Sequence, residues 1–501
     1  MTTPVLQTAT RRLGKTEANW VAVVKTGTGI SISSILFDRC IPAADLDFAL
    51  QELLAKNPRL RSKITYAEAD KKQQCFETPD EVSITVPVIP SRFDSLLQSN
   101  GGAEDSEGEI REPWHLITEE ELNTPFPTDC PFPVFECKLY ILSDSNCLVI
   151  LRLHSAAADI ASTGIIVKQI VESLHKRSFG TTDAAVADNG IDQAEVISKK
   201  MQDSATVGQK VADPKLLATT GGKLNYHLPC IESVVPPGEG KKPFWAHGMD
   251  VVGYGLGSRR YSYLPFQDTV SPRSSKLIRA ALTAEGTNLL LKECEKRGVS
   301  IGGAINAAGL KAVAAVKMLG MKEENYSSAV LVQCRHRLEP KLADSAVGFY
   351  HSAILRTMDV SESMPFWEVA TKCTKDFNEA IRNKKHFTDM GDLNTLLGQA
   401  LRFPNLTPSK TLRTATLSMT LDPVLEDVGP AAAAVGVKDY MSCSAAHGVG
   451  PCLGIFSFMR QRSLQFSFVY PSPLFSTSQT QRLVDHILNY LSVGSDNHPI
   501  A

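Results

Sequence analysis

A histidine and an aspartate stand close together at the end of an apolar run, an arrangement that suits acid–base chemistry. The run 148–151 leads into His154, and Asp159 follows after four intervening residues, all of them small. A histidine has a pKa near neutrality, so it can take a proton from an attacking hydroxyl or amine. The Asp on the turn behind it can fold back and hold that turn. The spacing alone is a weak signal, because a strand-end His followed by an Asp that caps the next helix serves structure equally well.

Ser155 follows His154 directly and offers different chemistry. Its hydroxyl is not basic near neutral pH, but it can donate a hydrogen bond or, with a base beside it, act as a nucleophile. Adjacent residues of a strand point to opposite faces, so only one of the two faces a substrate in a regular strand. A bulge would shift that register. The sequence leaves open which of the two side chains faces the substrate.

The segment resembles the His-His-x-x-x-Asp-Gly signature of condensation-type and BAHD-like CoA-dependent acyltransferases. Three further segments resemble the same superfamily in the same order: a helix pattern ending in 57–61, a helix pair over 282–308, and Arg335-His336-Arg337-Leu338-Glu339-Pro340 with Val347-Gly348-Phe349-Tyr350 downstream. The similarity therefore extends over most of the chain.

This resemblance implies an α/β fold of two chloramphenicol-acetyltransferase-like lobes, each a mixed sheet flanked by helices, with a tunnel between them. The active histidine would lie in the tunnel, where a thioester donor and an acceptor meet. The family's aspartate is mainly structural and pairs with an arginine. Asp159 would inherit that role, with Arg335 and Arg337 as the candidate partners.

The chain departs from the family pattern at the site itself. The family's base is the second histidine, which falls on Ser155, whereas His154 matches the first, supporting one. The glycine after the aspartate is Ile160. The Asp-Phe-Gly-Trp-Gly segment of the plant enzymes is missing, and a segment containing Ser418 stands in its approximate place. His351 stands near the position of an expected asparagine.

Three residues are candidates for substrate binding: His351, Ser418 and His447. His447 lies in a run of small residues, 442–450, which we expect to be a loop suited to close ligand approach. The alternatives are a hydrogen-bonded strand histidine at 351 and a surface loop around 447.

The hydrophobic pattern predicts the elements that must position these residues. The patterns at 135–142 and 147–153 predict a hairpin with a turn at 144–146. Thr283 and Ser300 are typical helix N-caps, and Gly298 is a typical helix stop. Further elements are expected as a strand at 328–334, a helix at 365–383, strands near 412–421 and 453–470, and a final helix at 477–492. The acidic segment 95–123 is expected to be partly an exposed loop.

We expect three units along the chain: a first lobe over 1–215, a connection over 216–275 and a second lobe over 276–501. The connection is assigned because strong periodicity is lost there and glycines and prolines interrupt the chain. No repeat of fixed short period is apparent in the sequence.

The composition excludes several classes of function. Hydrophobic residues make up 43% and charged residues 21%, as in ordinary globular proteins. The net charge of −2 argues against nucleic-acid and membrane-surface binding. We expect a cytoplasmic monomer, because the sequence shows neither a secretory signal nor a run of eighteen apolar residues. Its 11 cysteines form no CxxC pair, which favours reduced thiols and no metal site.

Three functions fit these observations. The first is an acyltransferase of specialised metabolism, moving an acyl group from acyl-CoA or another thioester to a hydroxyl or amine of a small molecule, with His154 as base. No bound cofactor is expected, since acyl-CoA would be a co-substrate. The second is the same fold used for cyclisation or condensation of a reactive molecule by positioning, without the usual base. The third is a non-catalytic binding protein.

Overall fold

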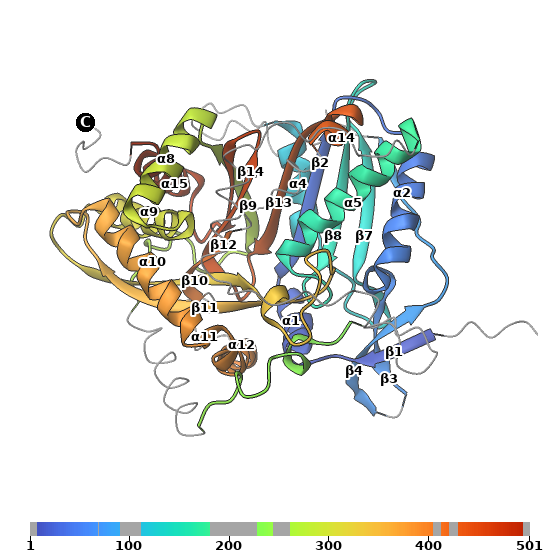
Figure 1. Cartoon of the computed structure of the whole chain (residues 1–501), viewed down its shortest axis with the longest axis horizontal. Coiled ribbons are helices and arrows are strands. Elements are labelled where there is room, and N and C mark those ends of the chain that lie inside the picture. The colour runs from blue at the N-terminus through green and yellow to red at the C-terminus, as the bar shows by residue number, and fades with distance from the viewer. Residues whose placement is uncertain are drawn as a thin grey trace, which may run out of the picture.

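The chain folds into two α/β lobes that lie side by side (Figure 1). The computed structural model describes residues 8–68, 70–90, 112–180, 228–243, 261–403, 412–419 (backbone only) and 429–493. The prediction of an α/β fold of mixed sheets flanked by helices is confirmed. The tunnel between the lobes and the domain boundaries stay predictions, although one strand of the first lobe, 437–446, comes from the range expected for the second. Residues 216–227 and 244–260 of the expected connection lie outside the described residues.

The first lobe is built on a five-stranded sheet in the order β13-β2-β8-β7-β5. The strands are β13 (Val437–Ala446), β2 (Thr28–Phe37), β8 (Cys147–His154), β7 (Phe135–Ile141) and β5 (Val88–Pro90). The helices α2 (Ala43–Lys56) and α5 (Ile160–Phe179) pack on one face, and α4 (Pro113–Asn123) packs on the other. The predicted hairpin is present as β7 and β8.

The side chains of β8 alternate between these two faces. Cys147, Val149, Leu151 and Leu153 join the core under α2 and α5. Leu148 and Ile150 join the core under α4. By this period-two pattern His154 belongs to the α4 face, and a strand continued by one residue would place Ser155 on the α5 face.

A small sheet in the order β1-β4-β3-β6 lies at the outer end of the first lobe (Figure 1). Its strands are β1 (Thr8–Arg12), β4 (Asp70–Pro79), β3 (Lys63–Ala67) and β6 (Phe132–Pro133). The helix α1 (Lys15–Val24) follows β1, and the 3-10 helix η1 (Pro58–Arg61) precedes β3.

The second lobe is built on a six-stranded sheet in the order β11-β10-β12-β14-β15-β9. The strands are β11 (His351–Val360), β10 (Glu324–Gln333), β12 (Leu412–Met419), β14 (Pro451–Arg460), β15 (Ser463–Ser472) and β9 (Ser274–Ala281). One large apolar core joins this sheet to α8 (Ala284–Arg297), α9 (Ile301–Val316), α10 (Phe366–Arg382) and α15 (Thr477–Val493).

The helix boundaries predicted in the second lobe are confirmed. The Thr283 and Ser300 side chains accept hydrogen bonds from the backbone N–H groups of Gly286 and Gly303, which satisfies donors that a helix start leaves free. Gly298 ends α8 in the left-handed conformation. The shorter elements are η3 (Ile231–Ser233), η4 (Arg335–Arg337), α11 (Lys385–Thr388), α12 (Met390–Arg402) and α14 (Gly429–Ala434).

One sequence prediction is wrong. Residues 442–446 are not a loop: they lie in β13, which pairs antiparallel with β2, and only 447–450 turn into β14. Small residues are accommodated there because β13 is packed between the two lobes. The acidic segment, expected to be partly an exposed loop, lies outside the described residues over 95–111. Its residues 113–123 form α4, whose Trp114, Ile117 and Leu122 are buried. The surrounding acidic composition obscured that apolar stripe.

A shared apolar cluster joins the lobes. Ile32 of β2 and Trp114 of α4 meet Leu277, Phe456 and Val469 of the second sheet in this cluster. Of the helices that the structure describes, none is by itself long and apolar enough to span a membrane. The helices α8 and α9 reach that length and apolarity only when taken together across a 105° bend. All 11 cysteines are free thiols.

Truncating a core leucine tests the burial pattern. Leu50 of α2 is 0% exposed, whereas Leu289 of α8 is 59% exposed. Leu50→Ala is expected to lower the free energy of unfolding by about 2–5 kcal/mol, through lost burial and the cavity left behind. Leu289→Ala, the matched control, should change it by less than about 0.5 kcal/mol. Urea unfolding followed by circular dichroism gives both values, and equal losses would contradict the assignment of the core.

Candidate active site

A fully buried ion pair fixes the turn after β8. Both side chains of the pair, Asp159 and Arg335, are 0% exposed. Arg335 donates from Nη1 to Asp159 Oδ2 at 3.0 Å and from Nη2 to Oδ1 at 2.9 Å. This fork-to-fork geometry is the strong, directional form of an arginine–carboxylate pair. Of the two candidate partners predicted for Asp159, the structure brings Arg335 into contact.

The remaining hydrogen-bonding capacity of the pair is used by neighbouring groups. Asp159 caps α5 by accepting from the Ser162 N–H at 2.9 Å, and it accepts from the Tyr350 N–H at 2.8 Å. Arg335 donates from Nε to the Ala346 carbonyl at 2.8 Å. Because Asp159 belongs to the first lobe and Arg335 to the second, this network ties the β8–α5 turn to the segment that leads into β11.

Electrostatics keep Asp159 ionised. Burial alone raises the pKa of its carboxyl, but the Arg335 guanidinium and the hydrogen bonds of the network outweigh burial, and the net pKa is lowered. The site therefore contains a permanent, internally neutralised charge pair at neutral pH.

His154 is enclosed on the α4 face. It is 1% exposed, and its ring lies 5.4 Å from the Phe126 ring and 5.7 Å from the Phe132 ring, centroid to centroid. Its Nδ1 accepts the Ala156 N–H at 3.1 Å, so the neutral ring carries its proton on Nε2. Burial, with a smaller effect from Lys25, lowers the pKa of His154 to about 3. The ring is neutral at physiological pH, and its basic nitrogen is already engaged.

Ser155 lies on the other face, toward α1 and β2. Its hydroxyl donates to the Gly29 carbonyl at 2.6 Å and lies 3.5 Å from the Ser31 hydroxyl. Gly29 has φ = +85°, and a Cβ there would fall 2.6 Å from the Trp20 ring and 3.2 Å from Ser155 Oγ. Only glycine therefore lets β2 approach Ser155 this closely.

A row of hydroxyl groups extends from Ser155 across the sheet. The Ser31 hydroxyl donates to Ser444 of β13 at 3.3 Å. One step along the strands, Ser442 of β13 lies 2.6 Å from the Thr163 hydroxyl of α5 and 3.5 Å from that of Ser33. This row of hydroxyls was not among the residues predicted from the sequence. Its signal was the alternation Ile30-Ser31-Ile32-Ser33, which places serines on one face of β2 and isoleucines on the other.

His351 and Arg337 lie on the second-lobe side of the ion pair. His351 begins β11 and is half-buried, and its ring lies 4.4 Å from the Phe349 ring. Burial lowers the pKa of His351 to about 4, although the Asp159 carboxylate partly opposes that effect. Its Nδ1 is buried and has no hydrogen-bond partner in the described part of the chain. Arg337, two residues beyond Arg335 on η4, makes no contact with Asp159 among the described residues.

His447 and Ser418 come from elements other than β8. His447 follows β13 directly, its Nδ1 lies 2.9 Å from the Ser275 hydroxyl of β9, and burial lowers its pKa to about 4. A Cβ on Gly27 would fall 2.0 Å from its Nε2, so His447 packs directly on the backbone before β2. Ser418 lies in β12 opposite Phe456 of β14, and the structure describes its backbone only.

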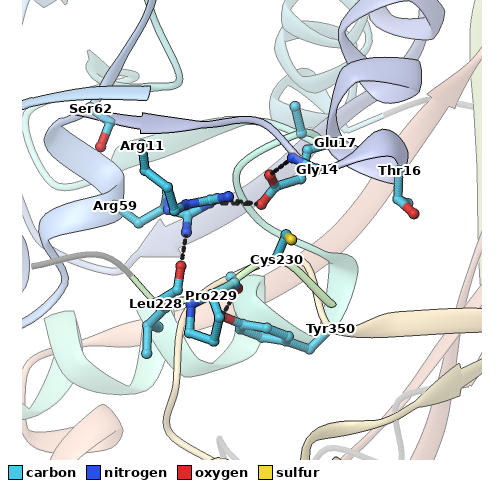
Figure 2. Close-up of polar contacts among 12 residues, drawn as sticks. Arg11, Gly14, Thr16, Glu17, Arg59, Ser62, Leu228, Pro229, Cys230 and Tyr350 are labelled. Carbon is cyan, nitrogen blue, oxygen red and sulfur yellow. Dashed lines mark hydrogen bonds and ion pairs between the residues drawn. The ribbon is translucent and has the colours of Figure 1, made fainter. Parts of the chain in front are cut away.

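Figure 2 shows a second buried polar cluster, which Tyr350 links to the ion pair through its N–H. The Tyr350 hydroxyl donates to the Pro229 carbonyl at 2.8 Å, and Arg59 donates to the neighbouring Leu228 carbonyl at 2.6 Å. Arg59 and Arg11 both pair with Glu17, at 3.0 and 2.6 Å. Leu228 and Pro229 are thus held between Arg59 of η1 and Tyr350, whose own N–H binds Asp159.

Solved structures of other proteins share this architecture, as comparison with them shows. No family model and no curated sequence matches the chain. The first condensation domain of the CDA synthetase covers 96% of this chain over 95% of its own length, at 16% identity and a TM-score of 0.57. The TRI3 trichothecene 15-O-acetyltransferase from Fusarium sporotrichioides matches 97% of this chain and 95% of its own length, at 12% identity and a TM-score of 0.65.

The chain has a condensation-domain fold. The EpoB cyclization-docking bidomain from Sorangium cellulosum agrees, covering 98% of the chain over 86% of its own length at 12% identity and a TM-score of 0.61. The resemblance found in the sequence is therefore confirmed at the level of the fold. The β8–α5 turn, which carries the His154, Ser155 and Asp159 predicted from the sequence, is the candidate active site. Among the described residues, no group of three His, Cys, Asp or Glu side chains is arranged to hold a metal ion.

Breaking the ion pair from one side should destabilise the protein strongly. Asp159→Asn leaves the Arg335 charge buried without a counter-charge, and we expect a loss of about 3–5 kcal/mol in the free energy of unfolding. The double variant Asp159→Asn/Arg335→Met should lose less than the sum of the single losses, because neither charge is then left alone. Glu293→Gln, which breaks a surface pair with Lys296 and Arg297, is the control and should have little effect. Additive losses in a urea-unfolding cycle would contradict the coupling.

Acid should destabilise the fold through His154. Its folded-state pKa of about 3 lies below the unfolded value of about 6.5, so the unfolded state binds a proton that the folded state does not. Stability attributable to this residue falls as the pH drops from about 6.5 toward 3, by up to about 1.4 kcal/mol per pH unit. His154→Asn, whose Oδ1 can replace Nδ1 as acceptor, should reduce the proton uptake on unfolding by about one at pH 4.5–5.5. The free energy of unfolding, measured against pH for the wild type and for His154→Asn, tests this prediction. Equal slopes for the two proteins over pH 4.5–5.5 would show that His154 titrates normally.

Proposed function

We propose that this chain catalyses an acyl-transfer or condensation reaction in which a small-molecule acceptor attacks a thioester, such as an acyl-CoA. The observation that carries the proposal is the β8–α5 turn: a strand ends, its next residue faces a row of hydroxyls, and the Asp159–Arg335 pair locks the turn between two lobes. The condensation-domain fold supports the proposal, since solved structures with that fold include an acetyltransferase and condensation domains.

The roles that we propose for the two neighbouring residues differ. Ser155 is the group that faces the reactants. Its O–H is donated to the Gly29 carbonyl, so its oxygen orients a reactant by accepting a hydrogen bond, for example from an amine N–H. His154 positions the turn through its bond from Ala156 and does not act as the base, because its Nδ1 is engaged and its pKa is about 3. The sequence named His154 as the base but left open which of the two side chains faces the substrate. The engaged Nδ1 and the lowered pKa of His154 favour Ser155.

Without an imidazole base, the mechanism that we propose depends on positioning and on a nucleophile that needs no base. A neutral amine attacks a thioester carbonyl with its lone pair and releases its proton afterwards, whereas an alcohol must lose its proton during the attack. Holding the two reactants in line can supply several kcal/mol of rate enhancement. We therefore propose an amine acceptor in preference to an alcohol, in an intermolecular condensation or in the cyclisation of one substrate.

A pair of adjacent variants tests these roles. Purified protein is incubated with acyl-CoA thioesters of increasing chain length and with amine or alcohol acceptors, and release of the CoA thiol is measured. Ser155→Ala should reduce kcat/KM about tenfold, as expected for a lost hydrogen bond in the transition state. His154→Asn, the matched neighbour, should keep kcat/KM within about threefold, once its folded fraction is established from its unfolding curve.

Other results would overturn the proposal in distinguishable ways. Loss of all turnover in folded His154→Asn, with activity retained in Ser155→Ala, would make His154 the base. Saturable binding of thioesters without turnover by any acceptor would make the chain a binding protein. Faster transfer to alcohols than to amines would contradict the proposed acceptor class.

A further inference from the structure

A partly open cavity of about 60 Å³ lies in the second lobe, outside the candidate active site. It is bounded by α9 and α15 on one side and by β10, β14 and β15 on the other. Ile455 and Tyr470 of the sheet line it, whereas their neighbours Phe456 and Val469 point into the cluster that joins the lobes. The cavity therefore lies on the face of the second sheet that is turned away from the lobe junction.

Two polar side chains at this cavity have unused hydrogen-bonding capacity. Ser327 of β10 is 4% exposed, and its hydroxyl has no partner within the described ranges. Asn306 of α9 is 8% exposed, and its amide makes no hydrogen bond to any described residue. By contrast, the Tyr326 and Tyr470 hydroxyls at the same wall are bonded to Glu324 and Thr477. A buried hydroxyl without a partner is costly, so Ser327 is available to an occupant of the cavity, and the Asn306 amide lines the same cavity.

Gly309 of α9 also keeps the cavity open. It lies in the interior of the helix, where glycine is less favourable than alanine. A Cβ at this position would meet nothing nearer than Ile455 Cδ1, at 3.7 Å, which is ordinary contact. Neither backbone conformation nor crowding requires glycine here. The absence of a side chain at Gly309 instead leaves open the space of the cavity that it lines.

We propose that this cavity binds a small, neutral and mostly apolar molecule, or the end of a longer one, whose single polar group is hydrogen-bonded by Asn306 and Ser327. None of the described residues that line it is charged, so a charged ligand would lose its hydration without a counter-charge. One water molecule needs about 10–15 Å³ of cavity volume, so this cavity of about 60 Å³ suits roughly four to six non-hydrogen atoms. This binding is independent of the proposed thioester chemistry.

The probes for this site are 1-pentanol and, as its charged counterpart, pentanoate. We expect 1-pentanol to give a saturable signal in ligand-observed NMR and to raise the thermal midpoint of the full chain, and pentanoate to do neither. Ser327→Ala should weaken 1-pentanol binding about fivefold to tenfold, since it removes one neutral hydrogen bond.

Substitution at Gly309 separates a binding site from a packing defect. Gly309→Leu fills the cavity and should abolish 1-pentanol binding, and the milder Gly309→Ala should weaken it while raising the thermal midpoint. Gly398→Ala is the matched control: it lies inside α12 with its nearest neighbour at 4.0 Å and should leave binding unchanged. Absence of 1-pentanol binding, or binding unaffected by both Gly309→Ala and Ser327→Ala, would overturn the proposal, whatever the thioester assay shows.

Discussion

The buried pair of Asp159 and Arg335 is the constraint on which the candidate site depends. Two charges removed from water cost more than their attraction returns unless every remaining donor and acceptor is satisfied. Here the carboxylate also caps α5 and receives the Tyr350 N–H, and the guanidinium also binds the Ala346 carbonyl. These requirements can be met in one arrangement of the two lobes, so the pair specifies geometry as much as it contributes stability.

That geometry gives two adjacent residues unlike environments. His154 is among aromatic rings and is neutral, while Ser155 lies where β2 comes close enough to accept its hydrogen bond. The hydroxyls that continue from Ser155 are uncharged and short, so they can hydrogen-bond to a substrate without adding charge to the interior. The site is thus polar but carries no net charge, because the charges of Asp159 and Arg335 neutralise each other.

Much of the fold was predictable because local rules decided it. Thr283, Ser300 and Gly298 fix helix ends through their own hydrogen bonds and backbone conformation, and 144–146 closes a hairpin between two apolar strands. What the sequence predicted wrongly or left open depended on partners distant in sequence. The second half of β13, 442–446, consists of small residues that form a strand beside β2. The sequence left Arg335 and Arg337 open as partners of Asp159, because the pairing depends on a turn 176 residues away. The cavity beside Gly309 arises from packing, which no local pattern contains.

The placement of β13 has a consequence for how the chain is made. The first sheet takes a strand from residues 437–446, next to β2 at residues 28–37. During synthesis β2 therefore has an unpaired edge until more than four hundred residues have left the ribosome, and such edges invite pairing with other chains. The first lobe cannot be completed as an autonomous N-terminal unit. A translation pause, a premature stop or a fusion point late in the gene would damage the half of the molecule that was synthesised first.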